Sequence, residues 1–320
     1  MPQSLPPGKL PQIAVCPQPD AFRVSVIIAT LNRPVQLQEC LQALAVGFPE
    51  DSEVIVVSDG GDKTRFPDLS RLVNPLNLKL IHVEHGGPAH ARNQALRLVN
   101  SPIVVFLDDD CLPHTDWLEN LISSVSLDPA VAAGGKTLNG LPENVFATAA
   151  QLILDVGERD QRERNYGPLF FSSNNLAFPT AALKALNGFN PEFRTAEDRE
   201  ICRKWLMAGN RLVKAPEAVL SHLPQLDYRR FWTKFMAYGR GAAKFHRSSA
   251  SNWRDESIAF HLRVPVLASR EMSDQGIKRR FSMYALLAVW ELANLTGFLK
   301  EKWRNRKPGM RSQVSGKSLP

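Results

Sequence analysis

The 320-residue chain has only four cysteines, and they lie far apart without forming a C-x-x-C pair. This spacing argues against a structural zinc site and against a disulfide framework, and it indicates a reducing compartment. No segment repeats at a fixed period, which argues against a solenoid or a propeller. The first residues also lack the basic start and apolar core of a secretory signal peptide, so we expect a cytoplasmic protein.

Motifs of several functional classes are missing as well. The histidines show no H-E-x-x-H spacing, and no Ser-His-Asp or Cys-His set is apparent. Gly86-Gly87-Pro88 opens a predicted helix without the lysine of a Walker loop. The basic, aromatic stretch 228–247 is accompanied by no recognised nucleic-acid motif, so we expect no nucleic-acid partner.

An excess of positive charge is confined to one end of the chain. Lysine and arginine number 39 against 32 acidic residues, a formal charge of +7. From Gly276 onward, ten basic residues stand against two acidic ones, so the remainder is nearly neutral. The hydrophobic share of 44% is ordinary for a globular protein. These numbers predict a folded body with a basic C-terminal extension.

Short apolar runs alternate with helical patterns in the first third of the chain. β-Branched runs predict buried strands, and apolar residues spaced three or four apart predict helices. The predicted strands are 23–30, 53–58, 78–83 and 103–107, with helices beginning at Pro34 and Pro88. This order predicts an α/β fold with a Rossmann-related, mainly parallel sheet flanked by helices.

The pattern beyond residue 110 is less regular. Strands are predicted at 131–135, 170–178, 211–214 and 218–222, and helices at 195–208 and 228–247. The segment 136–172 shows no pattern that we can decode.

Polar side chains follow three of the predicted strands. Thr30 ends the first strand and Asn32 lies just beyond it, and Asp59 follows the second. The fourth strand runs into Asp108-Asp109-Asp110. Ligands of open parallel sheets bind outside the carboxyl ends of the strands, so these side chains mark a candidate site. Adjacent carboxylates repel one another without a cation, and Mg²⁺ or Mn²⁺ suits them together with phosphate; a solvated turn with capping aspartates is the alternative.

Six ordered segments together resemble the signature blocks of family 2 glycosyltransferases, which have the GT-A fold. The segments are VSVIIATLNRP (24–34), VIVVSDGG (54–61), GGPAHARNQAL (86–96), FLDDDCLP (106–113), NNLAFPTAALKALNGFNPEF (174–193) and AEDREI (196–201). The resemblance covers about residues 24–222. It implies inverting transfer of a sugar from a nucleotide-diphospho-sugar to an acceptor hydroxyl of a glycolipid or surface polysaccharide precursor.

The resemblance also implies the residues that bind the donor. Thr30, Asn32 and Asp59 would hold the nucleoside, and Arg92 would lie near the nucleotide or its phosphates. Many relatives carry a second acidic residue where this chain has Ser58, which leaves the preferred nucleotide open.

Five further residues match the reactive part of the family pattern. Asp108 and Asp110 match the D-x-D motif, in which one carboxylate contacts the ribose or a metal-bound water and the latter ligates the metal. Asp109 fills the variable middle position of this donor-binding motif. Asp198 matches the catalytic base, and His222 matches a further metal ligand of some members.

Asp198 has a structural alternative, because Thr195-Ala196-Glu197-Asp198 also fits a helix capping box. Glu197 competes with Asp198 as the base. As the base, Asp198 would take the proton of the attacking hydroxyl, while a divalent cation on Asp110 would neutralise the leaving diphosphate. No Q-x-x-R-W-type motif follows, which predicts one sugar addition per encounter.

Two other functions remain as alternatives. A sugar-nucleotide nucleotidyltransferase would need a Gly-rich G-x-G-T-R-like loop where this chain has ATLNRP. A non-catalytic scaffold that binds nucleotide or carbohydrate would not need Asp108, Asp110 and Asp198 together.

The C-terminal third predicts membrane association. Residues 281–299 are predominantly apolar but contain Glu291 and Asn294, which makes them borderline for a span, and basic clusters flank them. We rank peripheral attachment to the anionic inner face of the cell membrane first, packing within a soluble body or oligomer second, and a span third. The predicted parts are a disordered lead-in (1–21), a catalytic domain (22–225), a helical basic region (226–305) and a disordered basic tail (306–320).

Overall fold

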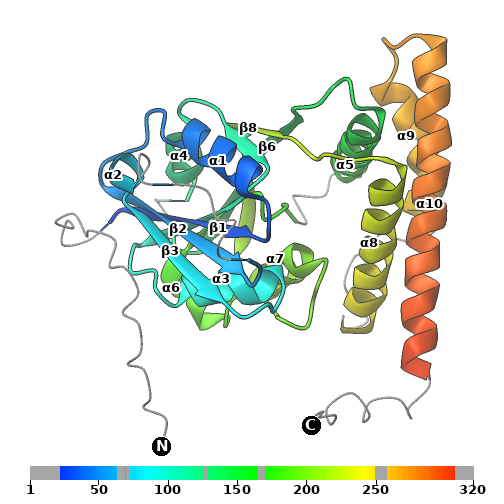
Figure 1. Cartoon of the computed structure of the whole chain (residues 1–320). Coiled ribbons are helices and arrows are strands. Elements are labelled where there is room, and N and C mark those ends of the chain that lie inside the picture. The colour runs from blue at the N-terminus through cyan, green and yellow to red at the C-terminus, as the bar shows by residue number, and fades with distance from the viewer. Residues whose placement is uncertain are drawn as a thin grey trace, which may run out of the picture.

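The computed structural model describes residues 22–62, 69, 73–125, 128–164, 170–248 and 258–306. The predicted lead-in and nearly all of the predicted tail lie outside these residues. An eight-stranded sheet carries helices on both faces, and a group of long helices stands beside it (Figure 1).

Four parallel strands form one half of the sheet, in the order β3-β2-β1-β4. They are β1 (Val24–Thr30), β2 (Ser52–Asp59), β3 (Leu78–Val83) and β4 (Ile103–Asp108). The three inner strands are buried almost throughout, because helices cover both faces, and this explains their continuous apolar runs. The register pairs Thr30 with Ser58 and Ala29 with Asp108, so the polar strand ends meet at one edge.

Helices cover both faces of the sheet. α1 (Pro34–Leu44) and α4 (Trp117–Ser123) cover one face with large apolar side chains. α3 (Pro88–Leu96) covers the other face with alanines, together with α6 (Thr180–Ala185) and α7 (Glu197–Met207). The short α2 (Val73–Leu76) precedes β3.

The second half of the sheet is mixed. β7 (Asn175–Pro179) runs antiparallel to β4 and β6 (Val131–Asn139), and β8 (Arg211–His222) joins β6 to β5 (Cys111–Pro113). β8 is one strand where two were predicted. It bulges between Ala215 and Val219, and Pro216, which has no backbone N–H, lies within the bulge.

Four long helices pack against one another beside the sheet (Figure 1). They are α5 (Val145–Glu163), α8 (Tyr228–Ser248), α9 (Ile258–Glu271) and α10 (Ile277–Arg306). α5 arises from the segment without a decodable pattern, and Asn144 caps its first turn by accepting hydrogen bonds from the backbone N–H groups of Phe146 and Ala147. The predicted division at residue 225 stays a proposal.

Candidate active site

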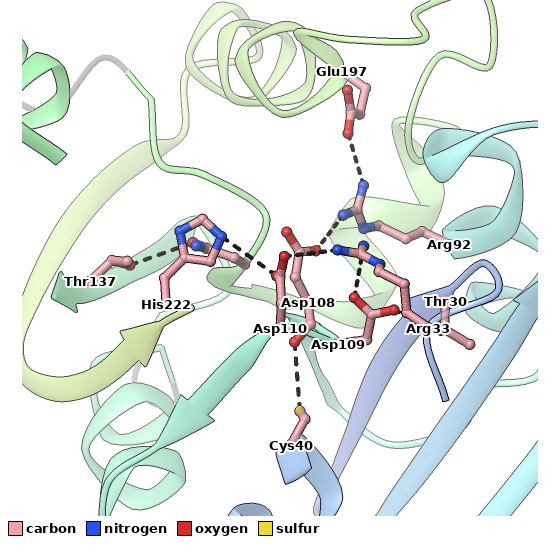
Figure 2. A network of polar contacts seen from close by, with 11 residues as sticks. Thr30, Arg33, Cys40, Arg92, Asp108, Asp109, Asp110, Thr137, Glu197 and His222 are labelled. Atoms are coloured by element: carbon pink, nitrogen blue, oxygen red, sulfur yellow. Dashed lines mark hydrogen bonds and ion pairs between the residues drawn. The ribbon is translucent and has the colours of Figure 1, made fainter. Parts of the chain in front are cut away.

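The three consecutive aspartates at the end of β4 point in different directions (Figure 2). Asp109 is fully buried, accepts a hydrogen bond of 2.6 Å from Thr30 Oγ1 and pairs with Arg33 at 2.7 Å. Burial raises the pKa of Asp109 to about 7, against the opposing effects of Arg33 and Thr30. Asp109 therefore ties β4 to the end of β1 and is closed to a ligand.

Asp110 faces His222 across the pairing of β5 with β8. Its Oδ1 lies 3.5 Å from His222 Nε2, and its Oδ2 lies 2.8 Å from Arg33. Burial favours the protonated form, but the hydrogen bond and charge of His222, with Arg33 and Lys234, outweigh it and lower the pKa of Asp110 below its usual range. This carboxylate stays ionised at neutral pH.

Three neighbouring residues, Asp110 and His222 among them, offer atoms that could ligate a cation. Single atoms of Asp110, Cys111 and His222 lie within 4.8 Å of one another. Burial raises the pKa of the Cys111 thiol well above its usual value, so the sulfur stays protonated and unsuited to a hard cation. Asp110 and His222 thus fit a Mg²⁺ or Mn²⁺ ion that takes its other ligands from water and phosphate.

Arg92 joins three elements at the other side of the aspartates (Figure 2). Its guanidinium donates to Asp108 at 2.7 Å and to Glu197 at 2.9 Å, and the side chain is only 4% exposed. The Asp108 side chain, at 29%, is the most exposed of the three aspartates. Arg92 therefore positions Asp108 and Glu197, and Asp108 keeps access to a ligand.

Asp198 lies in the first turn of α7, and the predicted capping box is wrong. The N-cap residue before the helix is Ala196, whose φ of 63° is left-handed, and no side chain caps the helix. Thr195 instead donates its hydroxyl to the carbonyl of Ala237 at 2.9 Å. The half-buried Asp198 carboxylate accepts a hydrogen bond from its neighbour's N–H at 2.7 Å, and burial plus the charge of Glu197 raises its pKa to about 7. Glu197 is paired with Arg92, whereas Asp198 has no cation partner among the described residues.

The residues expected to hold the nucleoside form a separate loop network. Asp59 accepts hydrogen bonds from the N–H groups of Gly86 and Gly87 at 2.8 and 2.9 Å, and pairs with His85 at 3.0 Å. Asn32, in a left-handed conformation with φ of 53°, accepts a hydrogen bond from Asp62 N at 3.2 Å. In this structure both side chains hold the backbone of the loops that follow the strands.

Two cations of the site were not singled out from the sequence. Arg33 follows Asn32 directly, but nothing local indicates that it contacts two aspartates 76 and 77 positions away. Lys234 comes from α8, and its charge acts on Asp110 although the two residues belong to different parts of the chain.

Comparisons with known proteins agree with this architecture. Residues 25–186 match the model of glycosyl transferase family 2. A pre-mycofactocin glycosyltransferase of Mycobacterium tuberculosis is 28% identical over 226 residues, which is 69% of this chain but only about half (47%) of the relative. A glucosyl-dolichyl phosphate glucuronosyltransferase of Haloferax volcanii is 22% identical over 247 residues, covering 70% of this chain and 76% of that protein.

A solved structure shares the fold. A mannosyltransferase from Pyrobaculum calidifontis, in complex with GDP-Man and Mn²⁺, matches with a TM-score of 0.62 and 23% identity. The match covers 91% of this chain and 90% of the other. The GT-A-like fold predicted from the sequence is thereby confirmed.

Proposed function

The chain belongs to glycosyl transferase family 2, and on that premise we propose that it transfers a sugar from a nucleotide-diphospho-sugar to an acceptor hydroxyl with inversion, one sugar per encounter. The observation that carries the proposal is the pair of carboxylates with opposite pKa shifts. Asp110 is held ionised beside His222, while Asp198 has a pKa of about 7. Two carboxyl groups whose pKa values are shifted in opposite directions suit separate roles in one reaction.

Asp198 acts as the general base in this proposal. Its pKa near neutrality lets it exist as the free carboxylate and still bind a proton, which is the condition for accepting one from an acceptor hydroxyl. Such a base contributes about 10²–10⁴-fold to the rate. A single displacement inverts the anomeric carbon when base and leaving group lie on opposite sides of the sugar.

The donor lies on the side of Asp108 and Asp110. Asp110 and His222 would hold Mg²⁺ or Mn²⁺, which neutralises negative charge on a leaving diphosphate when bound. Asp108, fixed by Arg92, would contact the ribose or a metal-bound water. Thr30, Asn32 and Asp59 would shape the surface on which the nucleoside rests.

The two alternative functions predict different behaviour. A nucleotidyltransferase would form a nucleotide-sugar from a nucleoside triphosphate, and a scaffold would bind a donor without turnover. Family membership and the raised pKa of Asp198 favour sugar transfer over both.

Thermal stabilisation by sugar nucleotides tests the donor proposal. Uridine and guanosine diphosphates and their sugar conjugates should raise the melting temperature of the protein in the presence of Mn²⁺. Asp110→Ala should abolish the Mn²⁺-dependent part, while the exposed Asp51→Ala control should keep it. If Mn²⁺ and nucleotide stabilise both variants equally, Asp110 is not a metal ligand. Conversion of a nucleoside triphosphate to a sugar nucleotide would favour the nucleotidyltransferase.

We further propose a lipid-linked or polysaccharide acceptor at the inner face of the cell membrane, on the evidence of α10. This is the one helix among the described residues that is long and apolar enough to cross a membrane. One side of it packs on the other long helices, through Met283, Leu287, Trp290 and Ala293. The opposite side is exposed and apolar; we call it the α10 stripe, and it comprises Phe281, Ala285, Ala288, Leu292, Leu295, Leu299 and Trp303.

The stripe suits the surface of an anionic bilayer. Basic residues stand at both of its ends, at Lys278, Arg279, Lys302 and Arg304. Glu291 is paired with His261 at 2.9 Å. Two copies pressed together along the stripe would bring like charges together in either orientation, whereas phosphatidyl headgroups would neutralise both ends. The packed opposite side favours attachment over a span.

Vesicle flotation tests the attachment. The protein should float with vesicles containing anionic phospholipid and less with neutral ones, and Leu292→Glu with Leu295→Glu should abolish flotation. The double variant Leu98→Glu/Val46→Glu, at exposed apolar positions elsewhere, is the control. A wild-type protein that stays with the aqueous fraction, or a dimer that the stripe variant splits, would refute membrane attachment.

A further inference from the structure

The chain from Leu223 through helix α8 contacts the candidate site at two places, at Asp110 and at Thr195, which leads into α7. The backbone N–H of Leu223, just after β8, donates to the carbonyl of Asp110 at 2.8 Å. Further along, Ala237 accepts the hydroxyl of Thr195. A methyl group on Gly241 would lie only 2.6 Å from Thr195 Oγ1, so the helix backbone touches the segment that leads into α7.

Lys234 is placed between these two anchor points. Residues spaced three or four apart share a helix face, so Lys234 lies on the face of Ala237 and Gly241, one to two turns nearer the metal end. The side chain is half-buried, and its ammonium lies 5.8 Å from the centre of the Tyr238 ring. Tyr238 in turn lies within the electrostatic reach of Asp198 and Asp108.

Lys234 differs from the other two cations of the site in having no carboxylate partner. Arg33 contacts two aspartates, and Arg92 contacts Asp108 and Glu197. Within the described part of the chain, no carboxylate oxygen lies within 4.0 Å of Lys234 Nζ, and its ammonium donates no hydrogen bond to these residues. Burial lowers the pKa of Lys234, while the charges of Asp110 and Asp108 oppose that shift.

A half-buried ammonium of this kind is stabilised by an anion that comes within hydrogen-bonding distance of it. The aspartates already have cations of their own, and the anion that sugar transfer brings is phosphate. We propose that Lys234 binds a phosphate group of a substrate, and its place near Asp110 favours the diphosphate of the donor over a phosphate of a lipid-linked acceptor. The proposal rests on the proposed function and adds a residue outside the matched family segment.

Calorimetric titration tests this role on the full chain. With Mn²⁺ present, Lys234→Met should bind inorganic pyrophosphate and uridine or guanosine diphosphate about 10- to 100-fold more weakly, the effect of one charge-assisted hydrogen bond. Lys234→Arg should restore part of the affinity. Arg229→Met removes one charge from the opposite side of the same helix and should change neither affinity. Uridine and guanosine, which lack phosphate, should bind wild type and variants alike.

The outcomes distinguish a donor phosphate from an acceptor phosphate, and a failure of this proposal from a failure of the proposed function. Unchanged pyrophosphate and nucleotide affinity, with a raised KM for a phosphate-bearing acceptor alone, assigns Lys234 to the acceptor phosphate. Unchanged values in all of these measurements overturn the proposal, as does an equal loss for the free nucleosides. Melting temperatures should differ little between wild type and Lys234→Met, because the ammonium loses no carboxylate partner and no hydrogen bond, only the contact with the Tyr238 ring and its charge interaction with Asp110 and Asp108. A wild-type protein that binds pyrophosphate through Lys234 but no nucleotide would refute the proposed function and leave the phosphate site standing.

Discussion

Asp198→Asn removes one ionisable group from the site and keeps the size of the side chain. The Asp198 carboxyl has a pKa of about 7, raised from 3.8 first by burial and then by the charge of Glu197. Only its ionised form can accept a proton, so wild-type kcat should rise with pH and level off above about 7. The variant should lose about 10²–10⁴-fold in kcat and keep its affinity for the donor.

The same pKa predicts an effect on stability, with a sign that can be derived. The folded protein holds this proton more tightly than the unfolded chain, because the folded-state pKa is the higher of the two. The stabilising contribution is therefore fully present below about pH 4 and is lost as the pH rises through 7. The full shift corresponds to about 4 kcal/mol, and because water still reaches the half-buried side chain we expect about 1–3 kcal/mol.

Urea unfolding at two pH values measures this contribution. The free energy of unfolding of Asp198→Asn, relative to wild type, should increase by about 1–3 kcal/mol between about pH 4 and about pH 8.5. Asp51→Asn, at an exposed position, is the control and should show no comparable change with pH. Retained turnover in Asp198→Asn, or a stability difference that does not change with pH, would contradict the assignment.

Three further predictions concern charge pairing and helix packing. Arg92→Met should destabilise the protein by about 3–5 kcal/mol in urea unfolding, because it leaves Glu197 buried without its cation; a loss below about 1 kcal/mol would contradict this. Gly239→Ala should lower the melting temperature, since its methyl group would lie 1.9 Å from the carbonyl oxygen of Asn294. Gly157→Ala, with open space around it in helix α5, should instead raise the free energy of unfolding by about 0.5–1 kcal/mol.

The parallel half of the sheet could be predicted because its signal is local. A strand buried on both faces needs a continuous apolar run, and the polar residue that ends each run is adjacent in the sequence. Parallel pairing then brings the ends of β1, β2 and β4 to one edge whatever the loops between them do. The positions of Thr30, Asp59 and the three aspartates follow from that rule.

The other half depends on partners that the sequence does not reveal. His222 meets Asp110 only because β5 and β8 pair antiparallel across 111 positions of chain. α5 has a polar side toward solvent and an apolar side toward α9 and α10, so its pattern makes sense only with those helices in place. The roles of Arg33 and Lys234 could not be predicted either, because the carboxylates near them are far away in the sequence.

The position of Asp198 is set by α8 more than by its own helix. A left-handed alanine costs about 1–3 kcal/mol, and Ala196 has no capping side chain to compensate. The compensation comes from the Thr195 hydroxyl bound to Ala237 and from the close backbone contact at Gly241. On its other side α8 meets α10 with equally little space, since a methyl group on Gly297 would lie 1.9 Å from the carbonyl oxygen of Met236.

Because both contacts involve backbone at van der Waals distance, α8 cannot shift toward either neighbour without strain. A bilayer that fixes the orientation of α10 would therefore fix α8 and, through Thr195, the first turn of α7, which carries the proposed base. The geometry places the proposed membrane surface and the proposed base on opposite sides of one helix. An acceptor anchored in the bilayer would thus approach a base whose position is already set relative to that bilayer, which reduces the orientational freedom lost on reaching the transition state.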